Sequence, residues 1–85
     1  MHDMKKLEDY SLESILDEAQ RMQRETFGMR HINISTAPSY LNIVIFERDY
    51  DKMEDGDLRN FTFYDFMDGY AREAEWERLM DYYNG

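Results

Sequence analysis

One apolar run, over residues 40–47, constrains the fold of this chain more than any other feature. It reads Tyr-Leu-Asn-Ile-Val-Ile-Phe-Glu and is the densest apolar run in the sequence and the only one rich in β-branched residues, which favour a pleated, half-buried surface. Because side chains alternate along a strand, Leu41, Ile43 and Ile45 form a fully apolar face, and the opposite face is mostly apolar. The run therefore predicts a strand near the middle of a small sheet.

A helix is predicted on the N-terminal side of this strand. Ser11 is a suitable N-cap, because its hydroxyl can accept a hydrogen bond from an orphan amide of the first turn. Apolar residues follow at helical spacing from Leu12 to Phe27, and Gly28 is expected to end the helix at a left-handed C-cap. Residues 1–10 show no periodicity and are expected to form a mobile arm or a loose first turn.

Two further strands are predicted around the central run. The alternating pattern of residues 30–35 predicts a strand, and the turn residues 36–39, which include Pro38, predict a hairpin with the central run. Residues 58–63 are expected to form a short third strand or an extended lead-in to the last helix. Between them, the charged residues 48–57 cannot bury themselves and are expected to form an exposed loop.

The C-terminal segment is predicted to be a second helix. Thr62 followed by Asp65 resembles a capping box, with Asp in place of the usual Glu or Gln. The apolar residues fall on two separate stripes, of which one runs from Phe63 to Ala74. The other, the C-terminal stripe, comprises Trp76, Leu79, Met80 and Tyr83. Because one sheet cannot cover both stripes of a straight helix, either Gly69 allows a bend or the C-terminal stripe contacts a partner.

These elements predict a two-layer α+β fold in a single domain over residues 1–85. A small antiparallel sheet of two or three strands carries the N-terminal and the C-terminal helix on one face. A chain this short has a small core, which leaves no room for an enclosed active site. The absence of cysteine excludes a disulfide framework and a thiolate metal site.

Charge is the strongest global property of the sequence. Asp and Glu number 19 against 10 Lys and Arg, a net charge of −9, and 12 of the acids with 5 of the bases lie from Glu47 onward. Such a chain repels nucleic acid and anionic membranes, so direct binding to either is not expected. No run approaches the roughly 20 apolar residues of a membrane span, and no signal core follows the N-terminal lysines. A soluble, cytoplasmic protein with a basic partner is expected.

The polar residues predict neither a metal site nor a catalytic site. Asp51, Asp55 and Asp57 have the spacing of an EF-hand calcium loop, but the last loop position, which needs a bidentate glutamate, is Thr62. The two histidines lie far apart in sequence, and no phosphate loop or nucleophile elbow is present. We therefore expect a protein that is not an enzyme and has no cofactor. The acidic residues form either a solvated loop or a row of carboxylates for a basic partner.

The candidate partner-binding residues form two groups. Tyr and Trp are favoured at interfaces, because they bury a large area and keep a polar group, and seven Tyr and one Trp are present. The first group, the acidic stretch, comprises Glu47, Asp49, Tyr50, Asp51, Glu54, Asp55 and Asp57. The second group is the C-terminal stripe.

In its short length, acidity, aromatic content, lack of cysteine and expected α+β fold, the chain resembles the small acidic anti-defence proteins of bacteriophages, in particular anti-CRISPR proteins. The resemblance is one of overall profile and includes no motif, so no functional residue of that family is placed on this sequence. It implies a non-enzymatic inhibitor, in the cytoplasm of a bacterial host, whose acidic surface mimics nucleic acid and blocks the DNA-binding cleft of a Cas effector. The alternative is a small structural or adaptor subunit that forms homo- or hetero-oligomers through the C-terminal stripe.

Overall fold

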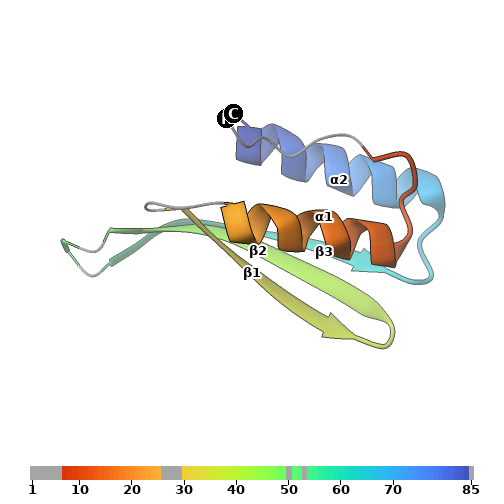
Figure 1. Ribbon diagram of the computed structural model, residues 1–85, viewed down its shortest axis with the longest axis horizontal. Helices are drawn as coiled ribbons and strands as arrows, with labels where there is room; N and C mark the ends of the chain where they lie inside the picture. The colour runs from red at the N-terminus through yellow and green to blue at the C-terminus, as the bar shows by residue number, and fades with distance from the viewer. Residues whose placement is uncertain (1–6, 26–29, 50, 53, 85) are drawn as a thin grey trace.

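The computed structural model describes residues 7–25, 30–49, 51–52 and 54–84, without the side chains of Asp49, Glu54, Asp55 and Asp57. Its elements are α1 (Leu12–Glu25), β1 (Arg30–Ala37), β2 (Tyr40–Asp49), β3 (Glu54–Tyr64) and α2 (Gly69–Asn84). The strands form one antiparallel sheet in the order β1-β2-β3, and both helices lie on the same face of it (Figure 1). The predicted α+β fold is confirmed, with three strands.

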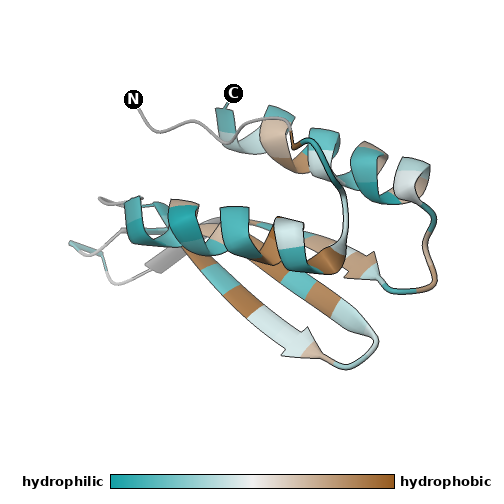
Figure 2. Cartoon of the chain, turned by 45° about the vertical axis from the view of Figure 1, so that its right-hand side comes forward, coloured by the Kyte–Doolittle hydropathy of each residue, from teal (hydrophilic) through white to brown (hydrophobic). Residues whose placement is uncertain are grey.

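β2 is the central strand, as its apolar run predicts. Ile43 pairs with Ile34 of β1 on one side and with Phe61 of β3 on the other. Ile43 and Ile45 are fully buried under the helices, and hydrophobic residues alternate along the strands (Figure 2). Burial of one such side chain contributes about 1.5–3 kcal/mol, so the inner face of β2 organises the core.

Each helix covers a different part of the sheet. α1 contacts β1 and β2, whereas α2 contacts β3. Trp76 of α2 is fully buried, and its ring lies 6.3 Å from that of Phe63 in β3, measured between centroids. The residues that complete the core are Ile15, Ala19, Met22, Ile32, Leu41, Ile43, Ile45, Phe61, Leu79 and Tyr83.

The start of α1 is as predicted, and the segment before it packs against the core. The amide of Ser14 donates to Ser11 Oγ at 3.2 Å, which confirms the N-cap. Leu7 and Tyr10 pack against the core, and Arg72 of α2 donates to the carbonyl oxygen of Tyr10. Residues 7–10 therefore contact the core and α2. Residues 1–6 and the predicted C-cap at Gly28 lie outside the described residues.

α2 begins six residues later than the predicted capping box. Thr62 lies within β3, and the N-cap is Asp68, whose Oδ1 accepts from the amide of Ala71 at 2.8 Å. The ladder with β2 continues through Phe63 and Tyr64 and prevents helix formation there. The predicted capping box is wrong because a residue pattern that suits a helix start also occurs at a strand end.

The predicted exposed loop over residues 48–57 is instead the end of a hairpin. β2 and β3 continue into it, with Arg48 opposite Asp55 and Asp49 opposite Glu54. The register shifts between Phe46 and Arg48, as at a β-bulge. A two-stranded end of a sheet is solvated, so charged residues do not prevent strand pairing there.

Candidate functional site

The acidic stretch occupies the hairpin between β2 and β3. Arg30 of β1 lies 3.6 Å from the Glu47 carboxylate and also donates to the carbonyl oxygen of Tyr83 at 2.6 Å. Asp51 is exposed in the turn. Tyr50 and the side chains of Asp49, Glu54, Asp55 and Asp57 lie outside what the structure describes. The backbone pairing brings these positions into one hairpin.

The C-terminal stripe faces the sheet rather than a partner. Trp76 and Leu79 have no exposed surface, Tyr83 is 8 % exposed, and Met80 packs against the same core. The other predicted stripe does not compete for the sheet, because Phe63 belongs to β3, while Phe66 precedes the helix and is 78 % exposed. The interpretation of the C-terminal stripe as an oligomer interface is therefore wrong.

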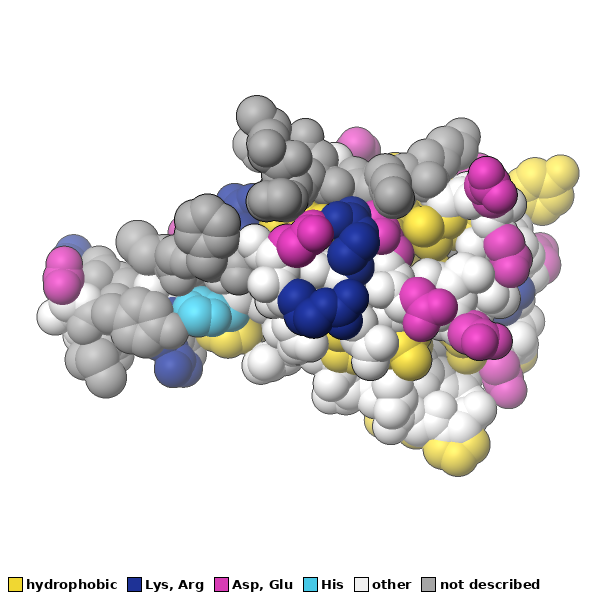
Figure 3. Space-filling view, in the orientation of Figure 1, with side chains coloured by type: hydrophobic (Ala, Val, Ile, Leu, Met, Phe, Trp, Pro, Cys, Tyr) yellow, Lys and Arg dark blue, Asp and Glu magenta, His cyan; other side chains and the backbone are white. Residues whose placement is uncertain are grey.

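Acidic side chains gather instead at the end of the molecule where both helices begin (Figure 3). A hollow of about 620 Å³ lies between the segment before α1 and the start of α2. Four carboxylates line it, together with the ring of Tyr70, which is 85 % exposed. This acidic hollow is lined by Leu7, Glu8, Asp9, Tyr10, Asp68, Gly69, Tyr70 and Glu73.

Hydrogen bonds hold the walls of the acidic hollow in place. Asp9 accepts from the amide of Ser11 at 3.1 Å and from Ser14 Oγ at 3.3 Å, while Asp68 caps α2. Arg72 donates to the carbonyl oxygens of Tyr10 and Met67, and thereby connects the two walls. The positive ends of two helix dipoles favour carboxylates at this place.

None of the four acids of the hollow is among the predicted site residues. Two of them carry a recognisable signal, because Asp9 and Asp68 each lie within three residues of a helix start, where Asp is favoured. Glu8 and Glu73 carry no such signal. Their proximity follows from the tertiary packing of segments that are distant in sequence, which the sequence does not reveal.

The face of the sheet away from the helices forms a second surface, the open face. Its cross-strand rows contain no Asp, Glu, Lys or Arg in the part that the structure describes, from the row of Ala37 to the row of His31. The rows are Ala37-Tyr40-Tyr64, Ser35-Asn42-Thr62, Asn33-Val44-Asn60 and His31-Phe46-Leu58. In a chain with 34 % charged residues, these rows are distinctly neutral, and Arg48 lies over the ring of Phe46 at their end, 5.9 Å from the centroid.

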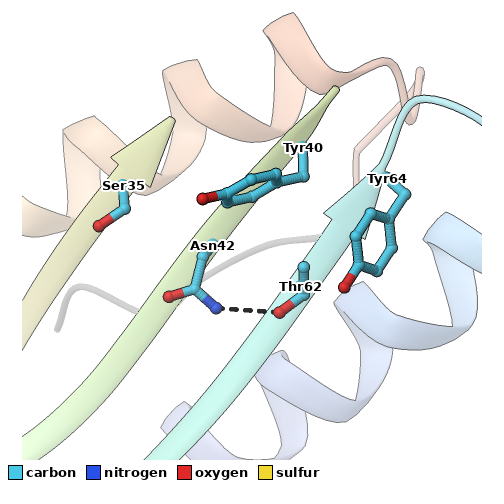
Figure 4. Close-up of a pocket in the computed structure, with 5 residues that line it drawn as sticks. All are labelled: Ser35, Tyr40, Asn42, Thr62 and Tyr64. Carbon is cyan, nitrogen blue, oxygen red and sulfur yellow. Dashed lines mark hydrogen bonds between the residues drawn. The ribbon is translucent and has the colours of Figure 1, made fainter. Parts of the chain in front are cut away.

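A hollow of about 300 Å³ on the open face is lined by Ser35, Tyr40, Asn42, Thr62 and Tyr64 (Figure 4). The amide of Asn42 donates to Thr62 Oγ1 at 2.9 Å and also bonds Asn60. Its side-chain oxygen points toward β1 in Figure 4. The polar groups of Asn42 thus connect β2 to β3. Hydrogen bonding between the strands is therefore enough to explain the polar residues of this row.

Within the described ranges, no group of three or more His, Asp or Glu residues could hold a metal ion, and no helix there is long and apolar enough to cross a membrane. Comparison with known proteins finds no matching family model, no matching curated protein and no matching solved structure.

Proposed function

We propose that this chain is a non-enzymatic inhibitor that binds a basic nucleic-acid-binding protein and presents carboxylates where that protein holds phosphates. The carrying observation is the acidic hollow, in which Glu8, Asp9, Asp68 and Glu73 line one concave surface beside the exposed ring of Tyr70. A cleft that binds DNA, such as that of a Cas effector, has the complementary charge.

The chemistry of the acidic hollow suits a Lys or Arg side chain of the partner. Carboxylates form charge-assisted hydrogen bonds with ammonium and guanidinium groups, and the face of a Tyr ring attracts the same cations. Concentrated negative charge in a concave site also accelerates association with a basic surface.

The dimensions of the molecule support mimicry of an extended polyanion. The chain measures 42 × 26 × 19 Å, and the starts of the two helices, where the acidic hollow lies, are at the opposite end of it from the β2–β3 hairpin (Figure 1). Duplex DNA carries one charge per roughly 1.7 Å of its axis. A DNA-binding cleft of similar length would contact both acidic ends of this chain.

Charge reversal in the acidic hollow tests the proposal against a panel of purified Cas effectors. We expect the variant Glu8→Lys with Glu73→Lys to bind an effector at least about tenfold more weakly than the wild type, since two favourable contacts become repulsive. The matched control is Glu77→Lys with Asp81→Lys, which makes the same charge change at exposed positions of α2 outside the hollow. Binding is measured by calorimetry, and inhibition by DNA cleavage.

The two variants separate a local contact from a general effect of charge. Equal losses in both variants would show that the acidic hollow is not the contact. Absence of binding to every effector, at low as well as physiological salt, would contradict the choice of partner. Thermal unfolding followed by circular dichroism establishes that each variant remains folded.

A further inference from the structure

The outer edge of β1 presents main-chain hydrogen-bonding groups to solvent. Gln23 Nε2 of α1 donates to the carbonyl oxygen of Ile32 at 2.8 Å, so this carbonyl points away from β2. In an antiparallel ladder alternate residues share one direction, and therefore the amides and carbonyls of Ile34 and Thr36 point the same way. Within the described ranges, Gln23 is the side chain that bonds this edge.

An apolar groove lies beside this end of the edge. A hollow of about 190 Å³ separates the first turns of α1 from the end of the β1–β2 hairpin. Leu12 and Leu16 of α1 are only partly buried there, and Thr36 and Ala37 form the opposite wall. Figure 3 shows hydrophobic side chains in a row along the seam between α1 and β1. A strand added at Thr36 would extend beside this groove.

The charges around the groove determine which peptide fits. Glu13 lines the groove, and Asp17 is exposed one turn later on α1. On the other side of the edge, Asn33 and Ser35 belong to the neutral open face. A strand that fits this edge therefore carries Leu, Lys or Arg on the side that faces α1, and small neutral residues on the side of the open face.

We propose that the outer edge of β1 binds an extended segment of a basic partner as a fourth strand. Ile34 and Thr36 supply the main-chain hydrogen bonds, the groove takes an apolar side chain, and Glu13 and Asp17 pair with Lys or Arg. This mode is strand addition, in which the backbone gives affinity and alternate side chains give specificity. The basic character of the segment rests on the proposed function.

The test uses the full chain and an acetylated, amidated peptide of sequence Thr-Lys-Thr-Leu-Thr-Lys-Thr. We expect saturable binding in titrations followed by NMR, and slower hydrogen exchange of the Ile34 and Thr36 amides by at least about tenfold, because ladder formation protects them. Thr36→Pro removes one edge donor while it leaves the bonds to β2, and should weaken binding by about tenfold. The matched control is Leu58→Pro on the outer edge of β3, which should bind like the wild type.

Two control peptides identify the cause of binding. An N-methylated peptide with the same side chains cannot form the ladder, and a peptide with Glu in place of Lys reverses the charge. Equal binding of the N-methylated peptide, without protection of the Ile34 and Thr36 amides, would overturn strand addition while the proposed function stands. Equal binding of the Glu peptide would overturn the basic character of the segment. Protection that appears without peptide and grows with protein concentration would identify a second copy of the chain as the occupant, and overturn the proposal.

Discussion

The two helices interact differently with the two outer edges of the sheet. On β3, three side chains of α2 bond the outward backbone groups: Glu75 accepts from the amide of Thr62 at 3.3 Å, Arg78 donates to Asn60 O at 3.2 Å, and Arg72 donates to Tyr64 O at 3.3 Å. On β1, α1 supplies the single bond from Gln23 to Ile32 within the described residues. α2 therefore closes its edge, whereas α1 leaves its edge accessible.

The difference leaves the β1 edge of the sheet more accessible to strand addition than the β3 edge. An open strand edge is a template for pairing with another chain, and natural proteins usually protect it. Here the guanidinium group of Arg78 also lies over the ring of Phe61, at 4.7 Å from the centroid, so α2 shields the β3 edge with packing as well as hydrogen bonds. The proposed strand addition is therefore expected at β1 and not at β3.

The largest effect is expected from loss of the anchor that holds α2 against β3. Trp76→Ala removes a fully buried indole that packs on Phe63, and should lower the free energy of unfolding by about 3–5 kcal/mol. A small domain has only about 5–15 kcal/mol in total. Urea unfolding measures the loss, and hydrogen exchange should show the Thr62 amide opening before the amides of β2.

Two variants keep this prediction testable. Tyr70→Ala changes an aromatic residue of the same helix that is 85 % exposed, and should alter stability by less than about 0.5 kcal/mol. If Trp76→Ala is unfolded, Trp76→Phe leaves a smaller cavity and still allows the exchange of Thr62 to be compared with that of Ile34. A loss in Trp76→Ala no larger than that in Tyr70→Ala would contradict the role of α2 as a rigid cover.

The sequence predicts the sheet well, because its signals are local. The alternation around Ile43 and the turn at Pro38 each act over a few residues, and both lead to the observed hairpin. The start of α2 was not predicted, because Thr62 and Asp65 satisfy a local helix-start pattern while the pairing of β3 with β2, a long-range interaction, overrides it. Local pattern and tertiary pairing therefore agree in β2 and conflict at the end of β3.

The candidate sites depend still more on long-range interactions. Glu8 and Glu73 line the same hollow, and Thr62 at the β3 edge bonds Glu75. The spacing of these residues in the sequence does not reveal that they lie close together. The burial of the C-terminal stripe follows from the same cause, since its cover is β3 and not a partner. Net charge predicts that a basic partner is suitable, but it does not predict where the carboxylates converge.

A smaller effect, dependent on pH, is expected at the closed edge. Arg78 donates to Glu75 at 2.9 Å through two nitrogens and, with the Thr62 amide, holds the pKa of Glu75 below its ordinary value of 4.5. A lowered pKa in the folded state means that this stability is present above the ordinary pKa and is lost as the pH falls through the folded one. Glu75→Gln should cost about 0.5–1 kcal/mol at neutral pH.

The difference between the wild type and Glu75→Gln isolates this contribution. Protonation of the other acids also changes the total stability, because it takes a chain of charge −9 through neutrality to a net positive charge at low pH. Unfolding is therefore measured for both proteins from neutral pH to successively lower pH, and the difference should shrink as the pH falls through the folded pKa of Glu75. A difference that stays constant over this range would show that the charge of Glu75 does not stabilise the β3 edge.

The smallest effect on stability is expected from Gln23→Ala, which removes the side-chain bond to the open edge. The lost hydrogen bond costs about 0.5–1 kcal/mol, because Gln23 is exposed and water replaces the amide, and the higher helix propensity of Ala offsets part of that cost. The carbonyl of Ile32 then becomes a third accessible position on the β1 edge, after Ile34 and Thr36. Binding of the Lys-containing peptide should therefore be retained or strengthened, whereas any variant that damages the edge should weaken it. A destabilisation above about 1.5 kcal/mol, measured by urea unfolding, would mean that α1 closes β1 as firmly as α2 closes β3, and the contrast between the two edges would disappear.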